Sequence, residues 1–389
     1  MEDKKVNVPM RRFEEFANAP EWEECNFSAV VDVRSGRDYK HLKDGDIPVF
    51  GTGGFLLSVS DSLSKNEDAV GIGRKGTIDN PYILRAPFWT VDTLFYAVPR
   101  KGMNLDFVFC LFQNVNWKSK DESTGVPSLS KTTINNVDTR VPSEKEQTKI
   151  GNFFATLDRT ITLHQRKLEK TKALKSAYLA EMFPAEGECK PKRRFAGFTD
   201  DWERCRLGEV AEITSGGTPN REISDYWNGE IPWATTAEVN YSLIEHTAEN
   251  ITKTGLDNSS AKIMPIGTIL MAMYGQGKTR GQVAILGIEA ATNQANANIV
   301  VNNDVNNYFV YHQLVKNYLT TRASANEGGQ ANLSLGIVKD LHISFTKDLT
   351  EQFKIGTFFS TLDRIITSHQ RKLEKLQNLK KAYLNEMFV

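Results

Sequence analysis

Two segments of the chain carry the same long pattern of apolar and polar positions. Mostly apolar residues recur in alternating steps of four and three, from Ile150 to Met182 and again from Ile355 to Met387. The polar positions in this series include His164, Lys175, His369 and Lys380. This alternation is the a/d seam of a coiled coil and predicts two long amphipathic helices. The seam positions expected to pack are Phe154, Leu157, Ile161 and Leu168 in the first helix, and Phe359, Leu362, Ile366 and Leu373 in the second.

The two helical segments are near-copies of one another. Glu146–Phe183 and Glu351–Phe388 align without gaps at an offset of 205, and 28 of the 38 residues are identical. Ser143 and Asp348 stand three residues before the glutamates and predict capping boxes. At ~1.5 Å per residue each helix would be a rod of roughly 55–60 Å. We expect the rods to pack on each other within the chain; pairing with another subunit, or two plain surface helices, are the alternatives.

The repeat extends beyond the helices. An arm that contains Arg-Arg-Phe opens at Pro9 and again at Pro191, and Trp22 then matches Trp202. Cys25 likewise matches Cys205, and Ser-Gly pairs recur at 35–36 and 215–216. The chain is therefore predicted to be two units, each a globular portion followed by a rod, related by a pseudo-twofold.

The globular portions are predicted to be mixed helix and sheet. Each contains strand-like runs, a glycine-flanked turn, a short helix near Phe107 or Phe309, and a polar loop rich in Gly and Ser. We expect an α+β fold with two globular domains and two long helices that pack on each other. The predicted boundaries are a first domain at 1–143, a long helix at 144–183, a linker at 184–192, a second domain at 193–346 and a long helix at 347–389.

Composition and charge narrow the class of protein. The chain has 389 residues, of which 40% are apolar and 25% charged, as is ordinary for a soluble protein with two or three domains. Four scattered cysteines without a CxxC pair fit a reducing cytosol, and no apolar run is long enough to predict a signal peptide or a membrane span. We therefore expect a cytoplasmic protein without a membrane partner. The net charge of zero disfavours a protein that binds nucleic acid unaided.

Several short motifs imitate catalytic sites but lack essential parts. Gly71–Gly76 fits GxGxxG, yet a turn sequence follows it instead of a helix. Lys278 and Thr279 resemble the end of a phosphate-binding loop whose first glycine would fall on Ala272. Asn80-Pro81-Tyr82 lacks the second proline of the adenine methyltransferase motif, and the six histidines form no metal-binding pattern. We expect no catalytic residue, no metal and no cofactor.

Two glycine-flanked basic segments remain as candidates for DNA contact. Arg74 and Lys75, and Lys278–Arg280, each follow a predicted strand at what we take to be corresponding places. Arginine and lysine can bind phosphates or guanine, and glutamine can bind adenine. The further polar candidates are Ser128, Ser130, Lys131, Gln276, Gln282, Gln330 and Asn332. Two solvated hairpin tips are the alternative interpretation.

Taken together, these motifs resemble one protein family. The helix block Gln147–Lys170, repeated at Gln352–Lys375, is typical of the DNA-specificity subunits of type I restriction–modification systems. The globular portions are similar to that family in GIGRKG with PFWTVDT, in GVPSLSKTTINN, in SGGTPNR with YWNGEIPW, and in GQANLSLG. The resemblance covers essentially the whole chain from Pro9 onward.

The resemblance implies a division of labour among subunits. Two target-recognition domains would read the halves of a split, asymmetric site in double-stranded DNA. The two helices would form an antiparallel coiled coil that separates these domains and sets the unread spacer. The helices would also dock two modification subunits, which bring S-adenosylmethionine and adenine-N6 methylation. Restriction subunits would add ATP-driven translocation and cleavage, so this chain would be no enzyme itself.

Two rival functions stay open on the sequence alone. A coiled-coil scaffold with two protein-binding domains is favoured by the neutral charge and predicts no sequence-selective DNA binding. A self-contained methyltransferase or nuclease predicts donor binding or metal-dependent cleavage by the isolated chain.

Overall fold

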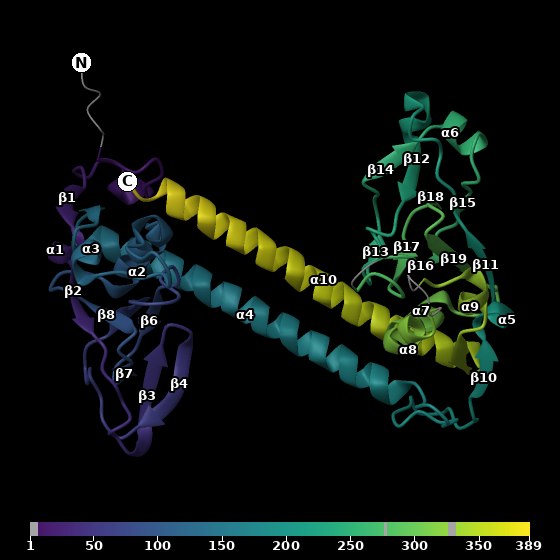
Figure 1. Cartoon of the computed structure of the whole chain (residues 1–389), viewed down its shortest axis with the longest axis horizontal. Coiled ribbons are helices and arrows are strands. Elements are labelled where there is room, and N and C mark those ends of the chain that lie inside the picture. Colours follow the sequence, from purple (N-terminus) through teal and green to yellow (C-terminus); the bar gives the residue numbers. More distant parts are fainter. Residues whose placement is uncertain (1–6, 276–277, 326–331) are drawn as a thin grey trace. The chain divides into compact units, whose positions relative to one another are not determined.

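A computed structural model describes residues 7–275, 278–325 and 332–389 (Figure 1). The chain divides into two compact units: unit 1 comprises Met1–Arg166 with Arg371–Val389, and unit 2 comprises Lys167–Gln370. The two predicted long helices are present as α4 (Glu144–Met182) and α10 (Leu349–Glu386). Each unit therefore holds one globular part together with a stretch of both long helices.

Unit 1 is built from mostly antiparallel strands, with β7 (Trp89–Thr90) parallel to β3 (Asp44–Gly51), backed by short helices. Its four-stranded sheet has the order β2 (Val31–Ser35), β8 (Leu94–Pro99), β5 (Ala69–Gly73) and β6 (Tyr82–Leu84). A second sheet has the order β4 (Gly54–Val59), β3 (Asp44–Gly51) and β7 (Trp89–Thr90), and β1 (Glu23–Asn26) pairs with β9 (Asp138–Val141). The helices are η1 (Glu14–Phe16), α1 (Phe27–Val30), α2 (Leu105–Asn114), η2 (Trp117–Lys120) and α3 (Lys131–Asn135).

Unit 2 repeats this plan with additions. Its larger sheet has the order β11 (Ala211–Ser215), β19 (Asn296–Val301), β16 (Ile269–Ala272), β17 (Val283–Leu286) and β13 (Leu243–Ile244). The other sheet has the order β14 (Glu249–Ile251), β12 (Trp227–Ala234), β18 (Ala290–Thr292) and β15 (Ile263–Met264), and β10 (Glu203–Arg206) pairs with β20 (His342–Phe345). The helices are α5 (Leu207–Val210), η3 (Ser224–Tyr226), α6 (Lys253–Asp257), α7 (Asn307–Lys316), α8 (Tyr318–Ala323) and α9 (Leu335–Lys339).

Strand register fixes which residues of the two units are equivalent. Val31 pairs with Pro99 in unit 1, and Ala211 pairs with Val301 in unit 2, each at the start of the same antiparallel ladder. The glycines of the repeated Ser-Gly pairs follow β2 and β11. A Cβ atom on Gly36 would lie 1.9 Å from the Val91 carbonyl oxygen, and one on Gly216 would lie 2.0 Å from that of Thr292. Any side chain here would collide with backbone, which explains why both units carry glycine.

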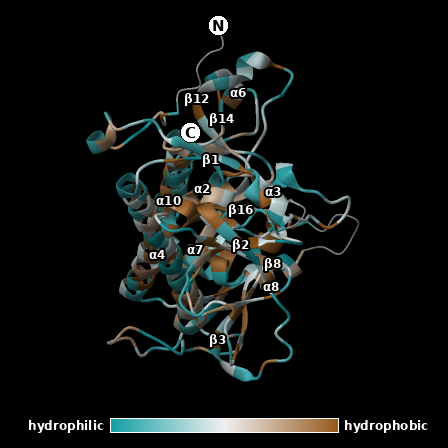
Figure 2. Ribbon diagram, turned by 90° about the vertical axis from the view of Figure 1, so that its left-hand side faces the viewer, coloured by the Kyte–Doolittle hydropathy of each residue, from teal (hydrophilic) through white to brown (hydrophobic). Residues whose placement is uncertain are grey.

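Aromatic rings stack on one another within the core of each unit. In unit 1, the ring of Phe388, just beyond α10, stacks on Phe107 of α2 at 5.6 Å between ring centroids. In unit 2, Phe183, just beyond α4, stacks on Phe359 of α10 at 5.8 Å. Figure 2 shows hydrophobic positions in brown gathered on α2 and on strands of the sheets, whereas the ribbon of α4 is largely teal and white. The long helices are thus polar rods that bury one stripe, as their sequence pattern predicts.

The two long helices run antiparallel within each unit. In unit 1, Asp158 of α4 pairs with Lys380 of α10 at 2.6 Å, and the Phe153 ring lies 5.2 Å from that of Tyr383. In unit 2, Lys175 of α4 pairs with Asp363 of α10 at 2.5 Å. Of the predicted seam residues, Phe154, Leu157, Leu168, Phe359 and Leu362 are buried, and Ile161, Ile366 and Leu373 are half-buried.

A glycine at the same position in both units lets α2 and α7 each approach a long helix closely. A Cβ atom on Gly151 of α4 would lie 2.4 Å from Oδ1 of Asn104, and one on Gly356 of α10 would lie 2.5 Å from Oδ1 of Asn306. Those same oxygens cap α2 and α7 by accepting hydrogen bonds from the Phe107 and Phe309 amides. The glycines therefore dock the cap of the short helix against the rod.

Candidate nucleic-acid interface

Each arm ties its globular part to a long helix through a buried ion pair. Arg12 donates to both carboxylate oxygens of Glu146, at 2.7 and 2.6 Å, and the Glu146 side chain is 1% exposed. Arg194 does the same to Glu351, at 2.6 and 2.9 Å, and that carboxylate is fully buried. The sequence predicted these glutamates as partners in capping boxes, but their carboxylates instead bind arginines more than a hundred residues away.

The preceding arginine of each arm contacts the end of the other long helix in the same unit. Arg11 pairs with Glu386 near the end of α10 at 2.5 Å, and its amide also donates to the Glu386 carbonyl. Arg193 pairs with Glu181 near the end of α4 at 2.6 Å, again with an amide hydrogen bond. Two adjacent arginines thus bind the start of one helix and the end of the other.

Buried glutamines complete this frame. Gln147 Nε2 donates to the Pro142 carbonyl, and its Oε1 accepts from the Asn104 amide. Gln352 makes the equivalent hydrogen bonds, to the Thr346 carbonyl and from the Asn306 amide. Because each amide side chain is satisfied at both ends, the orientation of the first helical turn is fixed relative to the domain.

The predicted basic turn of unit 1 lies directly beside the predicted polar loop. The Gly76 amide donates to the Pro127 carbonyl at 2.8 Å, and the Leu129 amide donates to the Arg74 carbonyl at 2.9 Å. Lys75 and Ser128 form an antiparallel bridge. The side chains of Arg74 and Lys75 are exposed, so this juxtaposition creates one surface with two cations and a hydroxyl.

The polar loop of unit 1 is held by its own side chains. Asp121 Oδ1 accepts from the amides of Ser128 and Ser123, and these hydrogen bonds lower the pKa of the Asp121 carboxyl. The Ser130 hydroxyl accepts from the Thr133 amide and so caps α3. Ser130 is thereby engaged structurally, whereas Lys131 at the first position of α3 is exposed.

The basic segment of unit 2 is supported in a different way. The Tyr318 hydroxyl donates to the Lys278 carbonyl at 2.6 Å and accepts from Arg322 Nη1 at 3.2 Å. The Tyr241 ring lies edge-on to that of Tyr318, and Tyr241 adopts a left-handed φ of 64°, which is rare outside glycine. Lys278 is exposed, whereas Thr279 and Arg280 are half-buried.

The two basic segments follow equivalent strands but occupy different positions after them. Leu129 donates to Arg74 in unit 1, and the equivalent Leu333 donates to Met273 in unit 2. The structural counterpart of Lys75 is therefore Tyr274, which is 43% exposed, and the segment from Lys278 lies further along the connection. Sequence alone could not show this, because the connection after the strand differs in length between the units.

The remaining predicted contacts are distributed as follows. Gln282 is half-buried at the start of β17, and Asn332 is half-buried just before the cap of α9. Gln276 and Gln330 lie outside the described residues. Tyr318 and Arg322 were missed by the sequence analysis, because only their contact with the Lys278 loop gives them significance.

A buried cluster on the helices resembles catalytic chemistry but is structural. In unit 2, His312 Nε2 lies 2.9 Å from Asp363 Oδ2, and Nδ1 lies 2.7 Å from the Tyr308 carbonyl. Burial lowers the pKa of His312, against the raising effect of Asp363. Burial would raise the pKa of Asp363, yet the hydrogen bond with His312 and the charge of Lys175 hold it below its ordinary value. The histidine is fully buried, so it is closed to a substrate.

The equivalent position in unit 1 carries Cys110. Burial raises the pKa of this thiol far above its ordinary value, so it is held as an unreactive thiol beside the Asp158–Lys380 pair. A hollow of about 460 Å³ on unit 2 is lined by Thr361, Arg364, Ile365, Ser368 and His369, all from α10.

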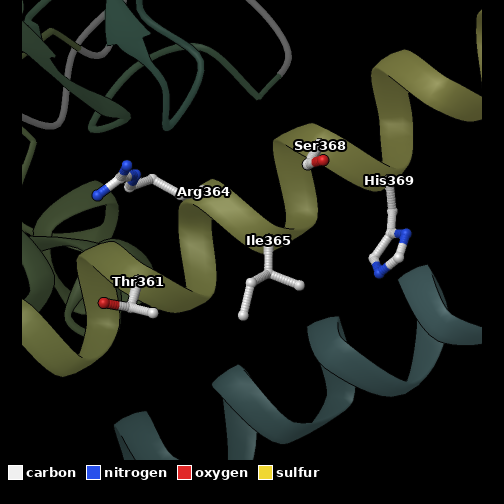
Figure 3. A pocket seen from close by; sticks show the side chains of 5 residues that line it. All are labelled: Thr361, Arg364, Ile365, Ser368 and His369. Atoms are coloured by element: carbon white, nitrogen blue, oxygen red, sulfur yellow. The ribbon is translucent and has the colours of Figure 1, made fainter.

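That hollow lacks the features of a small-molecule site. Figure 3 shows its residues on successive turns of one helix, with Arg364 extending to one side and Ile365 and His369 to the other. Four of the five side chains are exposed, so no polar group converges in a desolvated centre. Across the described residues, no three His, Cys, Asp or Glu side chains gather to hold a metal ion. The described helices include none both long and apolar enough to cross a membrane.

Comparison with known proteins finds a matching family and several similar proteins. A sequence model of the type I restriction modification DNA specificity domain matches residues 20–173 and 199–378. The type I restriction enzyme MjaIX specificity subunit of Methanocaldococcus jannaschii is 28% identical over 194 residues, which is 49% of this chain and 44% of that protein. The MjaVIII specificity subunit of the same organism is 22% identical over 341 residues, 82% of this chain and 75% of that protein.

Two further comparisons extend the picture. The EcoR124I/EcoR124II specificity subunit of Escherichia coli is 24% identical over 191 residues, 47% of each protein. The matched region thus spans about half the length of two of these three relatives. The crystal structure of a type I restriction-modification S subunit from M. genitalium superimposes with a TM-score of 0.74 at 14% identity, covering 98% of this chain and 99% of that one. At this identity the superposition shows a shared fold.

Proposed function

The chain belongs to the family of type I restriction–modification DNA specificity domains, and from this premise we propose that it reads a split, asymmetric sequence in double-stranded DNA. Each globular part, at 1–143 and 193–346, is proposed to be a target-recognition domain for one half of the site. The helices at 144–183 and 347–389, with the linker at 184–192, are proposed to set the unread spacer. Their expected length of roughly 55–60 Å exceeds one DNA turn of ~34–36 Å.

One observation carries this proposal: the units share a frame and differ at their exposed loops. The Arg12–Glu146 and Arg194–Glu351 pairs are equivalent and buried. The surface after the equivalent strands instead carries Lys75 in unit 1 and Tyr274 in unit 2. Two readers on one scaffold are what a site with two different halves requires, because base readout depends on the side chains presented to the groove.

We assign the DNA contacts to the loops described above. The proposed contacts are Arg74, Lys75, Ser128, Ser130 and Lys131 in unit 1, and Gln276, Lys278, Thr279, Arg280, Gln282, Gln330 and Asn332 in unit 2. Among those described, Lys75 and Lys278 are exposed and are best placed for phosphates or guanine edges. Ser130, already bound to the Thr133 amide, is the weakest member of the set.

The chemistry is proposed to belong to partner subunits. Two modification subunits would supply S-adenosylmethionine and adenine-N6 methylation, and restriction subunits would supply translocation and cleavage. The near-identity of the two helices fits two copies of one partner, whose docking would involve the exposed faces beside the seam. We propose no catalytic residue, metal or cofactor for this chain.

Methylation sequencing of the host genome, with and without this gene, tests the proposal. The expected result is a bipartite adenine-methylated motif that disappears with the gene. Lys278→Ala should relax one half of that motif, and inserting helical residues into both rods should change the spacer while both halves persist. A motif that survives deletion of the gene would refute the proposal. Altered half-sites at constant spacing in the insertion variant would refute the proposed role of the helices in setting the spacer.

A protein-binding scaffold is the second candidate, favoured by the net charge of zero. It predicts no sequence-selective shift of DNA in a gel, either for the chain alone or for the chain co-expressed with a modification subunit. A selective shift under either condition would exclude the scaffold as the sole function.

A further inference from the structure

The tip of the β3–β4 hairpin in unit 1 exposes two large apolar side chains. Phe55 is 62% exposed and Leu56 is 51% exposed. Burying such a side chain contributes roughly 1.5–3 kcal/mol, so two adjacent ones left in water are a departure from ordinary folding. Single exposed apolar residues need no explanation, but a pair at the end of a projecting hairpin indicates a contact surface.

The tip is narrow and held in place. Gly51 pairs with Gly54 across a two-residue turn, and Gly54 adopts a φ of 105°. A Cβ atom on Gly53 or Gly54 would meet nothing within 4 Å, so the turn stands clear of the protein. The Tyr82 hydroxyl donates to the Gly51 carbonyl at 2.6 Å, which anchors the base of the turn to β6.

The tip is apolar on both of its faces. Phe55 lies opposite Phe50, with ring centroids 6.3 Å apart, and Phe50 in turn contacts the Tyr82 ring. Leu56 covers the other face, where its Cδ1 lies 3.1 Å from the position of a Cβ on Gly51. A hairpin that is apolar on both sides fits insertion between two walls better than docking on one flat surface.

The turn lies next to the basic surface of unit 1. A Cβ atom on Gly76 would lie 3.9 Å from Oγ1 of Thr52, and Gly76 itself is bonded to Pro127. The hairpin turn, the Arg74–Gly76 turn and the polar loop at 127–129 are therefore neighbours in that order. No charged residue occurs between Ile47 and Ser60, whereas Arg74 and Lys75 are exposed beside the turn.

We propose that this hairpin tip enters a groove of the DNA half-site read by unit 1, with Phe55 and Leu56 against base edges. The arrangement matches the chemistry of a duplex, whose phosphates flank a groove floored by base edges and thymine methyl groups. Arg74 and Lys75 would bind the phosphates, and the uncharged, thin tip would reach past them. Apolar side chains inserted at a groove can also unstack a base step.

The proposal rests on the proposed DNA-specificity function and adds an apolar readout element to it. In unit 2 the equivalent strands β12 and β14 are joined by a longer connection that includes β13, so the described residues 235–248 form no such two-residue tip. The apolar contact would therefore serve one half of the site only.

Selection from a randomised duplex library tests the proposal, using the full chain alone and in its complex with co-expressed modification subunits. Phe55→Ala/Leu56→Ala is compared with Met10→Ala, a matched removal of an exposed apolar side chain elsewhere in unit 1, where Met10 is 84% exposed. The double variant should bind the selected duplex about tenfold more weakly, equivalent to about 1.4 kcal/mol. It should also lose sequence preference at one half-site, whereas Met10→Ala should bind as the parent chain does.

Salt dependence separates the apolar contact from a phosphate contact. An apolar side chain releases no counterions, so the slope of log K against log salt should be unchanged in Phe55→Ala/Leu56→Ala. Lys75→Ala should instead lower that slope by about one. Phe55→Leu keeps an apolar tip and should retain most of the affinity, which controls for damage to the fold.

The outcomes distinguish this proposal from the function on which it rests. If the parent chain selects no sequence, both fail. If the parent selects a bipartite sequence and the double variant selects the same one with equal affinity, the hairpin proposal alone fails. A double variant that binds DNA normally but no longer assembles with modification subunits would assign the tip to a protein partner and overturn the proposal.

Discussion

Unit 1 and unit 2 keep the same frame but support their exposed loops by different contacts. The arm arginines, the buried glutamines and the close-approach glycines have equivalent positions and equivalent hydrogen bonds. The exposed loops are held by different contacts. Asp121 accepts hydrogen bonds in the polar loop of unit 1, and the Tyr318 hydroxyl donates to the basic segment of unit 2. The difference teaches that the junction with the rods is the constrained part of each unit, whereas the presenting surface is free to change.

One buried site shows how the interior adapts to this freedom. In unit 1, Val49 of β3 pairs with Trp89 of β7; the equivalent pair in unit 2 is Trp233 of β12 with Ala291 of β18. The tryptophan therefore lies on β7 in unit 1, but on β12, the equivalent of β3, in unit 2. Its indole N–H nevertheless donates to the equivalent carbonyl in both units, that of Arg37 or of Gly217.

Breaking the buried ion pair of one unit is expected to give the largest effect. Glu351→Ala leaves Arg194 unpaired in a site where its side chain is only 13% exposed. Removing one partner of a buried pair costs about 3–5 kcal/mol. Hydrogen exchange read by mass spectrometry should show loss of protection in unit 2 peptides, with unit 1 much less affected.

Two controls sharpen this expectation. Arg194→Met/Glu351→Met removes both charges and should cost far less, since no buried charge is left alone. Glu386→Ala breaks the exposed Arg11–Glu386 pair and should change stability little. Equal destabilisation by Glu351→Ala and by the double methionine variant would show that the loss does not come from a buried charge left without its partner.

The exchanged tryptophan offers a second way to probe the comparison. Trp89→Ala should destabilise unit 1 by about 3 kcal/mol through the cavity it leaves. Val49→Trp alone should be overpacked, because Trp89 still fills the site. Together the two changes imitate unit 2, and urea unfolding should reveal a favourable coupling of about 1–3 kcal/mol. Additive losses would mean that the two sites are not interchangeable.

Acidification should distinguish the units next. His312 has a lowered pKa, so between its ordinary pKa and the lower folded value the unfolded chain binds the additional proton. Stability of unit 2 should therefore fall as the pH drops below about 6.5, with a slope of at most one proton, about 1.4 kcal/mol per pH unit. The raised pKa of Cys110 places no such transition in unit 1 at acidic pH.

Substitution checks the origin of that slope. His312→Cys introduces the residue type of unit 1 and should flatten the dependence of the unit 2 urea midpoint on pH below about 6.5. His342→Gln, at an exposed position of β20, is the matched control. A slope that persists in His312→Cys would place the titrating group elsewhere.

Sequence patterns predicted the rods and the repeat because these depend on local periodicity and on identity between copies. The seam of α4 and α10 and the antiparallel packing within each unit are confirmed. Contacts between distant residues were not predictable in this way. Glu146 gives a capping-box spacing with Ser143, but its carboxylate binds Arg12, which only the tertiary fold brings near.

The candidate surface was predicted in part for the same reason. Arg74 and Ser128 were selected separately, and the bridge between Lys75 and Ser128 brings their segments together. Lys278 follows the expected strand, but the backbone hydrogen bonds show that Tyr274 of unit 2 is the counterpart of Lys75 in unit 1. A single sequence cannot align connections of different length, so it could not reveal that exchange of a cation for an aromatic ring.

Removing the hydrogen bonds that hold the Lys278 segment of unit 2 should give the smallest change in stability. It should also give the most selective change in the proposed recognition of DNA sequence. Tyr318→Phe removes the hydroxyl that bonds the Lys278 carbonyl and Arg322, a loss of about 0.5–1.5 kcal/mol. The Tyr241–Tyr318 ring contact persists, so the global unfolding midpoint should move little. Tyr226→Phe, at a half-buried tyrosine of η3 in the same unit, is the matched control.

The expected readout is a methylated motif with one relaxed half. The Tyr318 hydroxyl fixes the backbone from which the exposed Lys278 extends. Its loss should therefore relax the half-site that unit 2 is proposed to read and leave the half-site proposed for unit 1 intact. Lys278→Ala in the Tyr318→Phe background should then add little, since residues acting through one contact are not additive. Relaxation of both half-sites, or fully additive effects of the two substitutions, would show that Lys278 does not act through the hydrogen bonds of Tyr318.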